Sequence, residues 1–144
     1  MIVIGLNPST ADESDDDPTI RRCIGFAKRE GCGKLVMLNL FAFRATKPAD
    51  LRAALDAIGP RTDFVLRRYA DDRRNRIVIA AWGRHGTPQR AARVMSMFAT
   101  VHCLGRNADG SPKHPLYLRA DTRLTRYRPK NKSAAGGGAG RFDA

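Results

Sequence analysis

The sequence has few cysteines, few acidic side chains and no long hydrophobic run. Its three cysteines form no paired motif, which argues against a disulfide framework and against a zinc site. No apolar run approaches the roughly 20 residues that a membrane-spanning helix needs. No charged-then-apolar signal segment begins the chain. These absences predict a reduced, cytoplasmic protein that does not enter the membrane, and we expect it to be a monomer.

Several common nucleotide-binding and catalytic motifs are also missing. The Gly-Lys-Ser/Thr ending of a phosphate-binding P-loop never occurs, and no Gly-x-Gly-x-x-Gly follows an apolar strand-like run. The second absence disfavours a dinucleotide cofactor. Without a Gly-x-Ser-x-Gly motif, a serine hydrolase of the α/β type is disfavoured as well. We therefore expect no cofactor and no bound metal ion.

The charge of the chain is strongly unbalanced. It has 26 Lys and Arg against 14 Asp and Glu, a formal net charge of +12. Such an excess usually indicates an anionic partner, and nucleic acid is the first candidate. The alternative is a generally basic, arginine-rich proteome in which the charge only keeps the protein soluble.

Hydrophobic periodicity predicts strands that alternate with helices. Ile20, Cys23, Ile24 and Ala27 have the spacing of one helix face, and Asp17 and Pro18 are suited to begin that helix. The predicted strands are 2–4, 34–39, 76–82 and 99–104. The predicted helices are 18–30, 48–58, 62–74 and 88–98.

This alternation predicts one α/β domain over residues 1–129. Its three layers (α/β/α) enclose a central, mostly parallel, four-stranded sheet covered by helices on both faces. Residues 130–144 are rich in Gly and Ala and are expected to form a flexible tail, either an unselected extension or an arm that holds DNA.

Polar side chains follow the predicted strands where each one ends. Asn7 and Asn39 follow the first two strands, and the third runs into Gly83. A later loop carries Lys113 and His114, and two prolines make it rigid. Ligands of α/β proteins usually bind at this edge of the sheet, so we expect one site built from several strand ends.

Two groups in this region have alternative interpretations. Asp12, Asp16 and Asp17 could bind Mg²⁺, but helix capping by Asp17 within a solvated acidic loop is the preferred explanation. His114 could donate a hydrogen bond to a developing anion, or it could be a loop histidine without a role. Phe41 or Phe43 could stack on a flat ring, or both could belong to the core.

Four stretches together resemble the DUF1643 family, whose activity is not established. They are Leu-Asn-Pro-Ser-Thr-Ala-Asp at 6–12, Asp-Asp-Pro-Thr-Ile-Arg-Arg-Cys at 16–23, Asn-Leu-Phe-Ala-Phe-Arg-Ala-Thr at 39–46 and Gly-Ser-Pro-Lys-His-Pro-Leu-Tyr at 110–117. The stretches span most of the predicted domain, so the resemblance implies that the whole domain has the fold of that family.

A more distant likeness is to the uracil-DNA glycosylase superfamily. Gly-Leu-Asn-Pro at 5–8 is similar to its Gly-Ile-Asn-Pro-Gly motif, and Val-Met-Leu-Asn at 36–39 to its Leu-Leu-Asn strand end. Ala-Trp-Gly-Arg-His at 81–85 is similar to its Leu-Trp-Gly-Ser-His, and His114-Pro115 occupies the place of its His-Pro loop. This resemblance implies the glycosylase-like version of the three-layer fold.

The same resemblance implies a role for each matching residue. Asn7 and His114 would be catalytic: Asn7 would orient the attacking water, and His114 would stabilise the negative charge on the leaving base. Asn39 would pair with the edge of the base. The substrate-binding set implied in this way is Gly5, Pro8, Ser9, Asn39, Phe41, Arg44, Gly83 and Lys113.

These patterns predict an enzyme that recognises a base in DNA or in a nucleotide and hydrolyses its N-glycosidic bond. An alternative is a binding module that keeps the same pocket without catalysis. A third hypothesis is magnesium-dependent phosphoryl chemistry at the acidic residues 12–17. DNA is the expected partner in the first hypothesis, with a free nucleotide as the other option.

Overall fold

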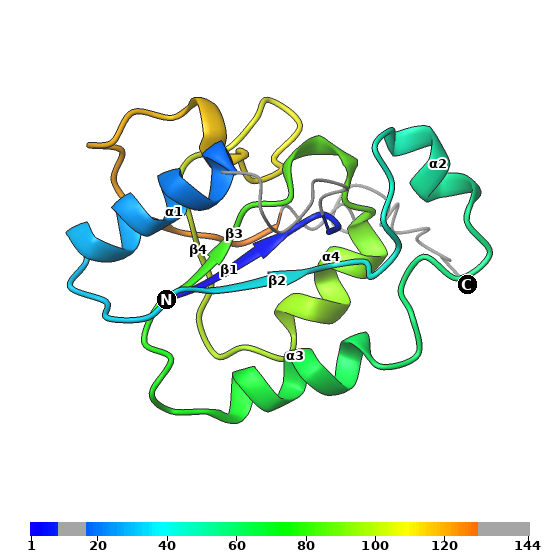
Figure 1. Cartoon of the computed structure of the whole chain (residues 1–144), viewed down its shortest axis with the longest axis horizontal. Coiled ribbons are helices and arrows are strands. Elements are labelled where there is room, and N and C mark those ends of the chain that lie inside the picture. The colour runs from blue at the N-terminus through cyan, green and yellow to red at the C-terminus, as the bar shows by residue number, and fades with distance from the viewer. Residues whose placement is uncertain (9–16, 130–144) are drawn as a thin grey trace, which may run out of the picture.

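The computed structural model describes residues 1–8 and 17–129, which form a five-stranded sheet in the order β2-β1-β3-β4-β5 (Figure 1). Three strand pairs, β1–β2, β1–β3 and β3–β4, are parallel, whereas β5 is antiparallel to β4. The strands are β1 (Ile2–Gly5), β2 (Val36–Asn39), β3 (Val78–Ala80), β4 (His102–Cys103) and β5 (Thr125–Arg126).

Two of the helices begin at capping side chains that the sequence indicates. The Asp17 side chain accepts a hydrogen bond from the Thr19 amide at 2.8 Å, and Thr87 accepts one from the Arg90 amide at 3.3 Å. None of the helices in the described part of the chain is long and apolar enough to cross a membrane. The helices are α1 (Pro18–Arg29), α2 (Pro48–Ala53), α3 (Thr62–Asp71) and α4 (Pro88–Met95), with short 3₁₀ helices η1 (Gly83–His85) and η2 (Pro115–Tyr117).

Helices cover both faces of the sheet, which confirms the three-layer prediction (Figure 1). On one face, Phe26 of α1 packs in a cluster with Val3 and Ile79. On the other face, Leu66 of α3 and Val94 of α4 pack in a cluster with the strand residues that point the opposite way, such as Ile4. Because successive side chains alternate between the faces, β1 contributes to both cores.

The prediction of four strands was wrong, because β5 adds a fifth at the edge of the sheet. Thr125 and Arg126 are both exposed, so this two-residue strand has no hydrophobic alternation to indicate it. The fourth strand and the second helix were predicted too long. The fourth strand consists of only His102–Cys103. Helix α2 ends at Ala53 because Ala54 has an extended backbone. Leu55, counted as helical from the sequence, is fully exposed.

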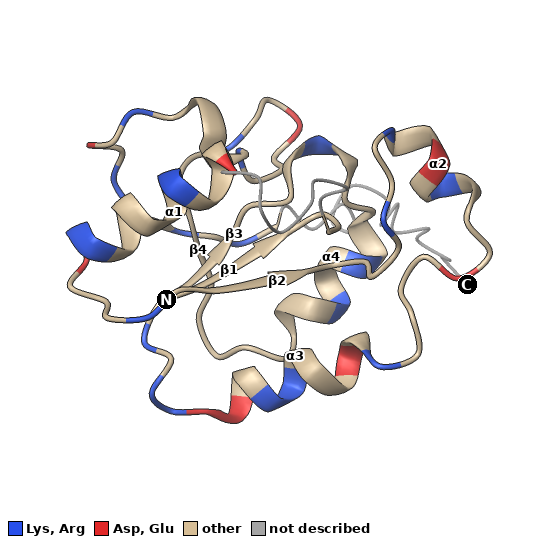
Figure 2. Cartoon of the chain, viewed as in Figure 1, with Lys and Arg blue, Asp and Glu red and all other residues tan. Residues whose placement is uncertain are grey.

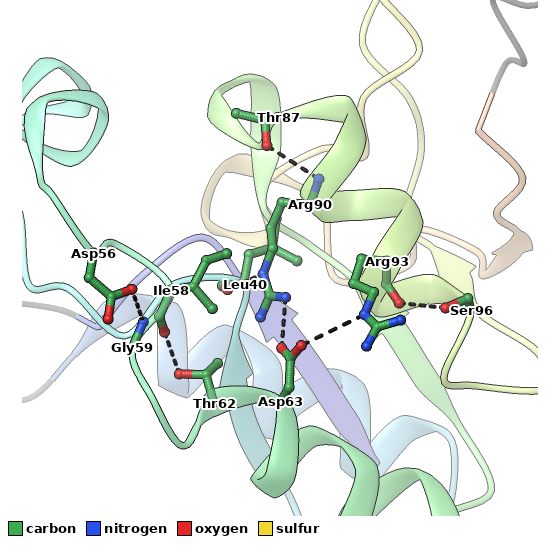
Figure 3. A network of polar contacts seen from close by, with 10 residues as sticks. All are labelled: Leu40, Asp56, Ile58, Gly59, Thr62, Asp63, Thr87, Arg90, Arg93 and Ser96. Carbon is green, nitrogen blue, oxygen red and sulfur yellow. Dashed lines mark hydrogen bonds and ion pairs between the residues drawn. The ribbon is translucent and has the colours of Figure 1, made fainter.

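A buried guanidinium connects α3, α4 and the end of β2 (Figure 3). The Arg90 Nη1 lies 2.7 Å from a carboxylate oxygen of Asp63, and its Nε donates to the Leu40 carbonyl at 2.7 Å. Arg90 is 5% exposed. From the sequence it looks like one more surface arginine, because nothing in the helical pattern marks it as buried.

Asp63→Ala should therefore destabilise the fold. The change leaves the Arg90 charge buried without its carboxylate, and such losses typically cost about 3–5 kcal/mol. We expect a loss of about 2–4 kcal/mol in the free energy of unfolding, because the Asp63 side chain is 37% exposed. Urea denaturation measures it. The control is Asp71→Ala at the exposed end of α3, expected to change stability by less than about 0.5 kcal/mol; equal losses in the two variants would contradict the interpretation.

Candidate functional site

A cavity of about 410 Å³ lies at the carboxyl ends of β1 and β2. We call it the Asn39 cavity. Gly5, Asn7 and Pro8 line it from the end of β1, Asn39 from the end of β2, and His114 from the loop before η2. The structure thus brings together the three polar residues that the strand-end argument expected to meet. The volume is within the range of small-molecule sites.

The amide of Asn7 has a fixed orientation. Its Nδ2 donates to the carbonyl oxygens of Phe43 at 3.2 Å and Ala45 at 2.9 Å. These two acceptors account for both amide hydrogens, so Oδ1 is the atom through which Asn7 can interact with a ligand. Asn7 can therefore accept a hydrogen bond from a ligand or a water but has no hydrogen left to donate.

Asn39 reaches the cavity because Gly5 has no side chain. The two residues are register partners in β1 and β2, and a Cβ built on Gly5 would lie 2.9 Å from Oδ1 of Asn39. Within the described residues, no hydrogen-bond partner is recorded for the Asn39 amide. It keeps a donor and an acceptor for a ligand.

His114 is held as a neutral imidazole. Its Nδ1 accepts a hydrogen bond from the Leu116 amide at 3.2 Å, which caps η2. A nitrogen that accepts carries no proton, so the proton resides on Nε2. Partial burial lowers the pKa of His114 below its ordinary value, and the charge of Asp17 opposes this effect only in part. His114 can therefore donate one hydrogen bond from Nε2 at neutral pH.

A second cavity of about 600 Å³ adjoins the first and shares Asn7 and His114 with it. We call it the Arg84 cavity. Two predicted substrate-binding residues, Gly83 and Lys113, line this second space together with Arg84. The predicted site is therefore divided into two compartments, one with amide groups and one with cationic groups.

Phe41 and Arg44, two further predicted site residues, line neither of these cavities. Phe41 is 7% exposed and belongs to the core, although it also lines a smaller hollow with Pro8 and Asn39. This supports the packing interpretation of Phe41. Arg44 is exposed and lines none of these spaces. Ser9 lies outside the described residues.

The position of Asp17 in the site was not predicted from the sequence. Asp17 was identified as a helix cap, but it also lines the Asn39 cavity, and its charge acts on His114. The two residues are far apart in the chain, so no local signal indicates their proximity. Among the described residues, no cluster of His, Cys, Asp or Glu could hold a metal ion. Asp12 and Asp16, the other members of the possible magnesium site, lie outside that part of the chain.

The fold is that of a small α/β protein with two adjoining cavities at the carboxyl edge of a mostly parallel sheet. A family model described as "Protein of unknown function (DUF1643)" matches residues 1–116. The chain belongs to this family. No curated protein and no solved structure matches it.

Gly5→Ala should displace the Asn39 amide. The new Cβ would lie 2.9 Å from its Oδ1, and the end of the side chain can move away at a cost of about 1 kcal/mol. The side-chain amide resonances of Asn39 in an NMR spectrum report the displacement. Gly25→Ala in α1 is the matched control, because its Cβ would meet nothing within 4 Å. It should raise stability by up to about 1 kcal/mol and leave the Asn39 resonances in place; unmoved resonances in Gly5→Ala would contradict the geometry.

His114 should titrate below 6.5, its ordinary pKa. The pKa is lower in the folded state than in the unfolded one. The neutral ring therefore contributes fully to stability above the unfolded pKa of 6.5. This contribution is lost as the pH falls through the folded pKa. NMR of the imidazole nitrogens should show Nε2 protonated and Nδ1 unprotonated at pH 7. A protonated Nδ1 at pH 7 would contradict the assignment, and His114→Gln should remove this part of the pH dependence.

Proposed function

We propose that the protein recognises a base of a nucleic acid or nucleotide in the Asn39 cavity and hydrolyses the N-glycosidic bond that joins it to the sugar. The observation that carries this proposal is that Asn7, Asn39 and His114 line one cavity. Each supplies a different interaction: an acceptor, a donor–acceptor pair and a neutral donor.

Base recognition would depend on Asn39. The edge of a nucleobase presents donors and acceptors side by side, and an amide can match both. A base in a duplex would first have to leave the stack to reach such a cavity. The formal charge of +12 is consistent with a partner that carries phosphates.

Hydrolysis adds water across the bond between the sugar carbon and the base nitrogen. Asn7 Oδ1 would accept a hydrogen bond from the water and so aim its oxygen at the sugar carbon. As the carbon–nitrogen bond breaks, the electron pair stays on the base, and the Nε2 hydrogen bond of His114 stabilises that negative charge. The hydroxyl group ends on the sugar and the remaining proton on the base. The likeness of the strand-end motifs to the uracil-DNA glycosylase superfamily supports the same roles.

A second candidate function is recognition of the base without catalysis. Asp17 is the carboxylate among the described residues that line the Asn39 cavity, and it already caps α1 by accepting from the Thr19 amide. Among the other described lining residues, only His114 could remove a proton from water at neutral pH. Its Nδ1 already accepts a hydrogen bond from the Leu116 amide. A cavity without a free general base is suited to binding. It is also compatible with slow hydrolysis in which Asn7 only orients the water. The binding module predicts saturable binding that Asn39→Ala abolishes, with no release of a base.

The hydrolysis is tested on single- and double-stranded DNA that carries uracil or other damaged bases. Released base and abasic sites are measured. We expect His114→Gln to lower the rate of base release by about 10²–10³-fold, the usual effect of losing one donor to a developing anion. Asn39→Ala should weaken binding of the substrate.

The matched control is Asn75→Ala, because the Asn75 amide donates to the Tyr69 carbonyl at the opposite edge of the sheet. It should leave the rate unchanged. If the wild-type protein releases no more base than a variant with both Asn7→Ala and His114→Gln, the hydrolysis is excluded. The binding module then stands only if Asn39→Ala abolishes binding.

A further inference from the structure

The Arg84 cavity differs in charge from the Asn39 cavity. Arg84 and Lys113 both line it, and neither forms an ion pair with any described residue. The stem of Lys113 lies over Gly105, where an added Cβ would be 3.3 Å from its Cδ. Described lining residues of this cavity include no carboxylate, whereas Asp17 lines the Asn39 cavity. An anionic group of a ligand is therefore favoured in the Arg84 cavity.

Arg84 acts electrostatically on the carboxylate of Asp109, which is hydrogen-bonded to Ser111. Asp109 accepts hydrogen bonds from the amide and the hydroxyl of Ser111, and these bonds lower its pKa. The charge of Arg84 adds to this effect but is not its main cause. Because no ion pair joins Arg84 to Asp109 or to any other described carboxylate, Arg84 remains able to bind another anion.

The two cavities meet at Asn7 and His114, the residues assigned to the bond between base and sugar. A ligand that fills both spaces would place its glycosidic bond beside this shared wall. Its uncharged ring would then lie against Asn39 and its phosphate against Arg84 and Lys113. A nucleotide unit has this order of parts.

Tyr117 borders the Arg84 cavity and is 88% exposed. Its backbone is fixed at the end of η2, because the Leu118 amide donates to the Pro115 carbonyl at 3.1 Å. An exposed aromatic ring on a fixed backbone, next to two cationic groups, is the combination by which proteins bind single strands, with bases stacked on rings and phosphates on basic groups. Bases that remain stacked in a duplex offer no face to such a ring.

We propose that the Arg84 cavity and Tyr117 form a subsite for single-stranded nucleic acid. Arg84 and Lys113 bind the phosphate of the nucleotide whose base occupies the Asn39 cavity, and Tyr117 stacks on a neighbouring base. This inference rests on the proposed base recognition in the Asn39 cavity but does not require hydrolysis.

Charge alone does not locate the subsite, because Lys and Arg occur on all four labelled helices (Figure 2). The test therefore compares two pairs of arginine and lysine changes. Arg84→Gln with Lys113→Gln removes the cations of the subsite. Arg73→Gln with Arg76→Gln removes the same charge before β3, at the amino edge of the sheet.

Fluorescence anisotropy with a labelled single-stranded oligonucleotide, at several salt concentrations, measures the affinities of both double variants. The subsite pair should weaken binding by at least about tenfold. It should also reduce the slope of log affinity against log salt by about 0.7, the contribution of one neutralised phosphate on a single strand. The control pair should change the affinity and the salt slope much less. Equal effects of the two pairs would overturn the subsite.

Tyr117→Ala should weaken binding of the oligonucleotide by about tenfold, a typical effect of losing one stacked base. Tyr117→Phe should keep the affinity. Phe64→Ala is the control, because Phe64 is an exposed aromatic residue on α3. A matched duplex should bind the wild-type protein more weakly than the single strand. Tighter binding of the duplex, or an unchanged affinity in Tyr117→Ala, would overturn the single-strand assignment.

The two proposals can fail separately. If the protein binds the strand through Arg84, Lys113 and Tyr117 but releases no base from any substrate, hydrolysis is excluded and the subsite is supported. If bases are released at the wild-type rate by the subsite pair and by Tyr117→Ala, and their affinities are unchanged, the subsite is overturned while hydrolysis stands. Circular dichroism confirms that each variant is folded.

Discussion

The position of the site depends on the buried guanidinium of Arg90. It neutralises Asp63 of α3, extends from α4 and donates to the carbonyl of Leu40, the residue directly after Asn39. Three elements are thus held to the point where β2 ends. A charge taken out of water is stable only when it is paired, so this contact has little freedom to rearrange. The backbone next to Asn39 is thus bound by a group that lines neither cavity.

The groups around the Asn39 cavity act mainly through neutral dipoles. Asn7 presents an oxygen because two carbonyls occupy its nitrogen, and His114 presents Nε2–H because a backbone amide occupies Nδ1. Each side chain is oriented by what its other end binds. The cationic groups Arg84 and Lys113 lie in the neighbouring cavity, whereas the carboxylate of Asp17 lines the Asn39 cavity. Oriented dipoles in such a space can stabilise a developing charge without repelling an uncharged ring.

Much of this arrangement could be predicted from the sequence. The rest depends on contacts between distant residues or on segments without hydrophobic periodicity. Apolar runs and caps gave the alternation of strands and helices, and the rule that parallel strands share an edge predicted that Asn7, Asn39 and His114 would meet. β5 could not be predicted, because two exposed residues carry no period. Arg90 was missed because its burial comes from contacts with α3 and β2, which are distant in the chain. The nearness of Asp17 to His114 is likewise a result of folding alone.

The pairing of Gly5 with Asn39 has a consequence for how the two strands find their alignment. Sliding β2 by two residues along β1 would leave every apolar side chain on its original face, so the alternation of faces alone does not exclude it. Yet it would carry the amide about 6.6 Å along the strand, away from the one position without a Cβ. The backbone bonds from Leu40 to Gly5 and from Phe41 to Leu6 continue the correct alignment past the strand end. A redesign that preserved only the hydrophobic pattern of these strands could fold without placing the Asn39 amide in the cavity.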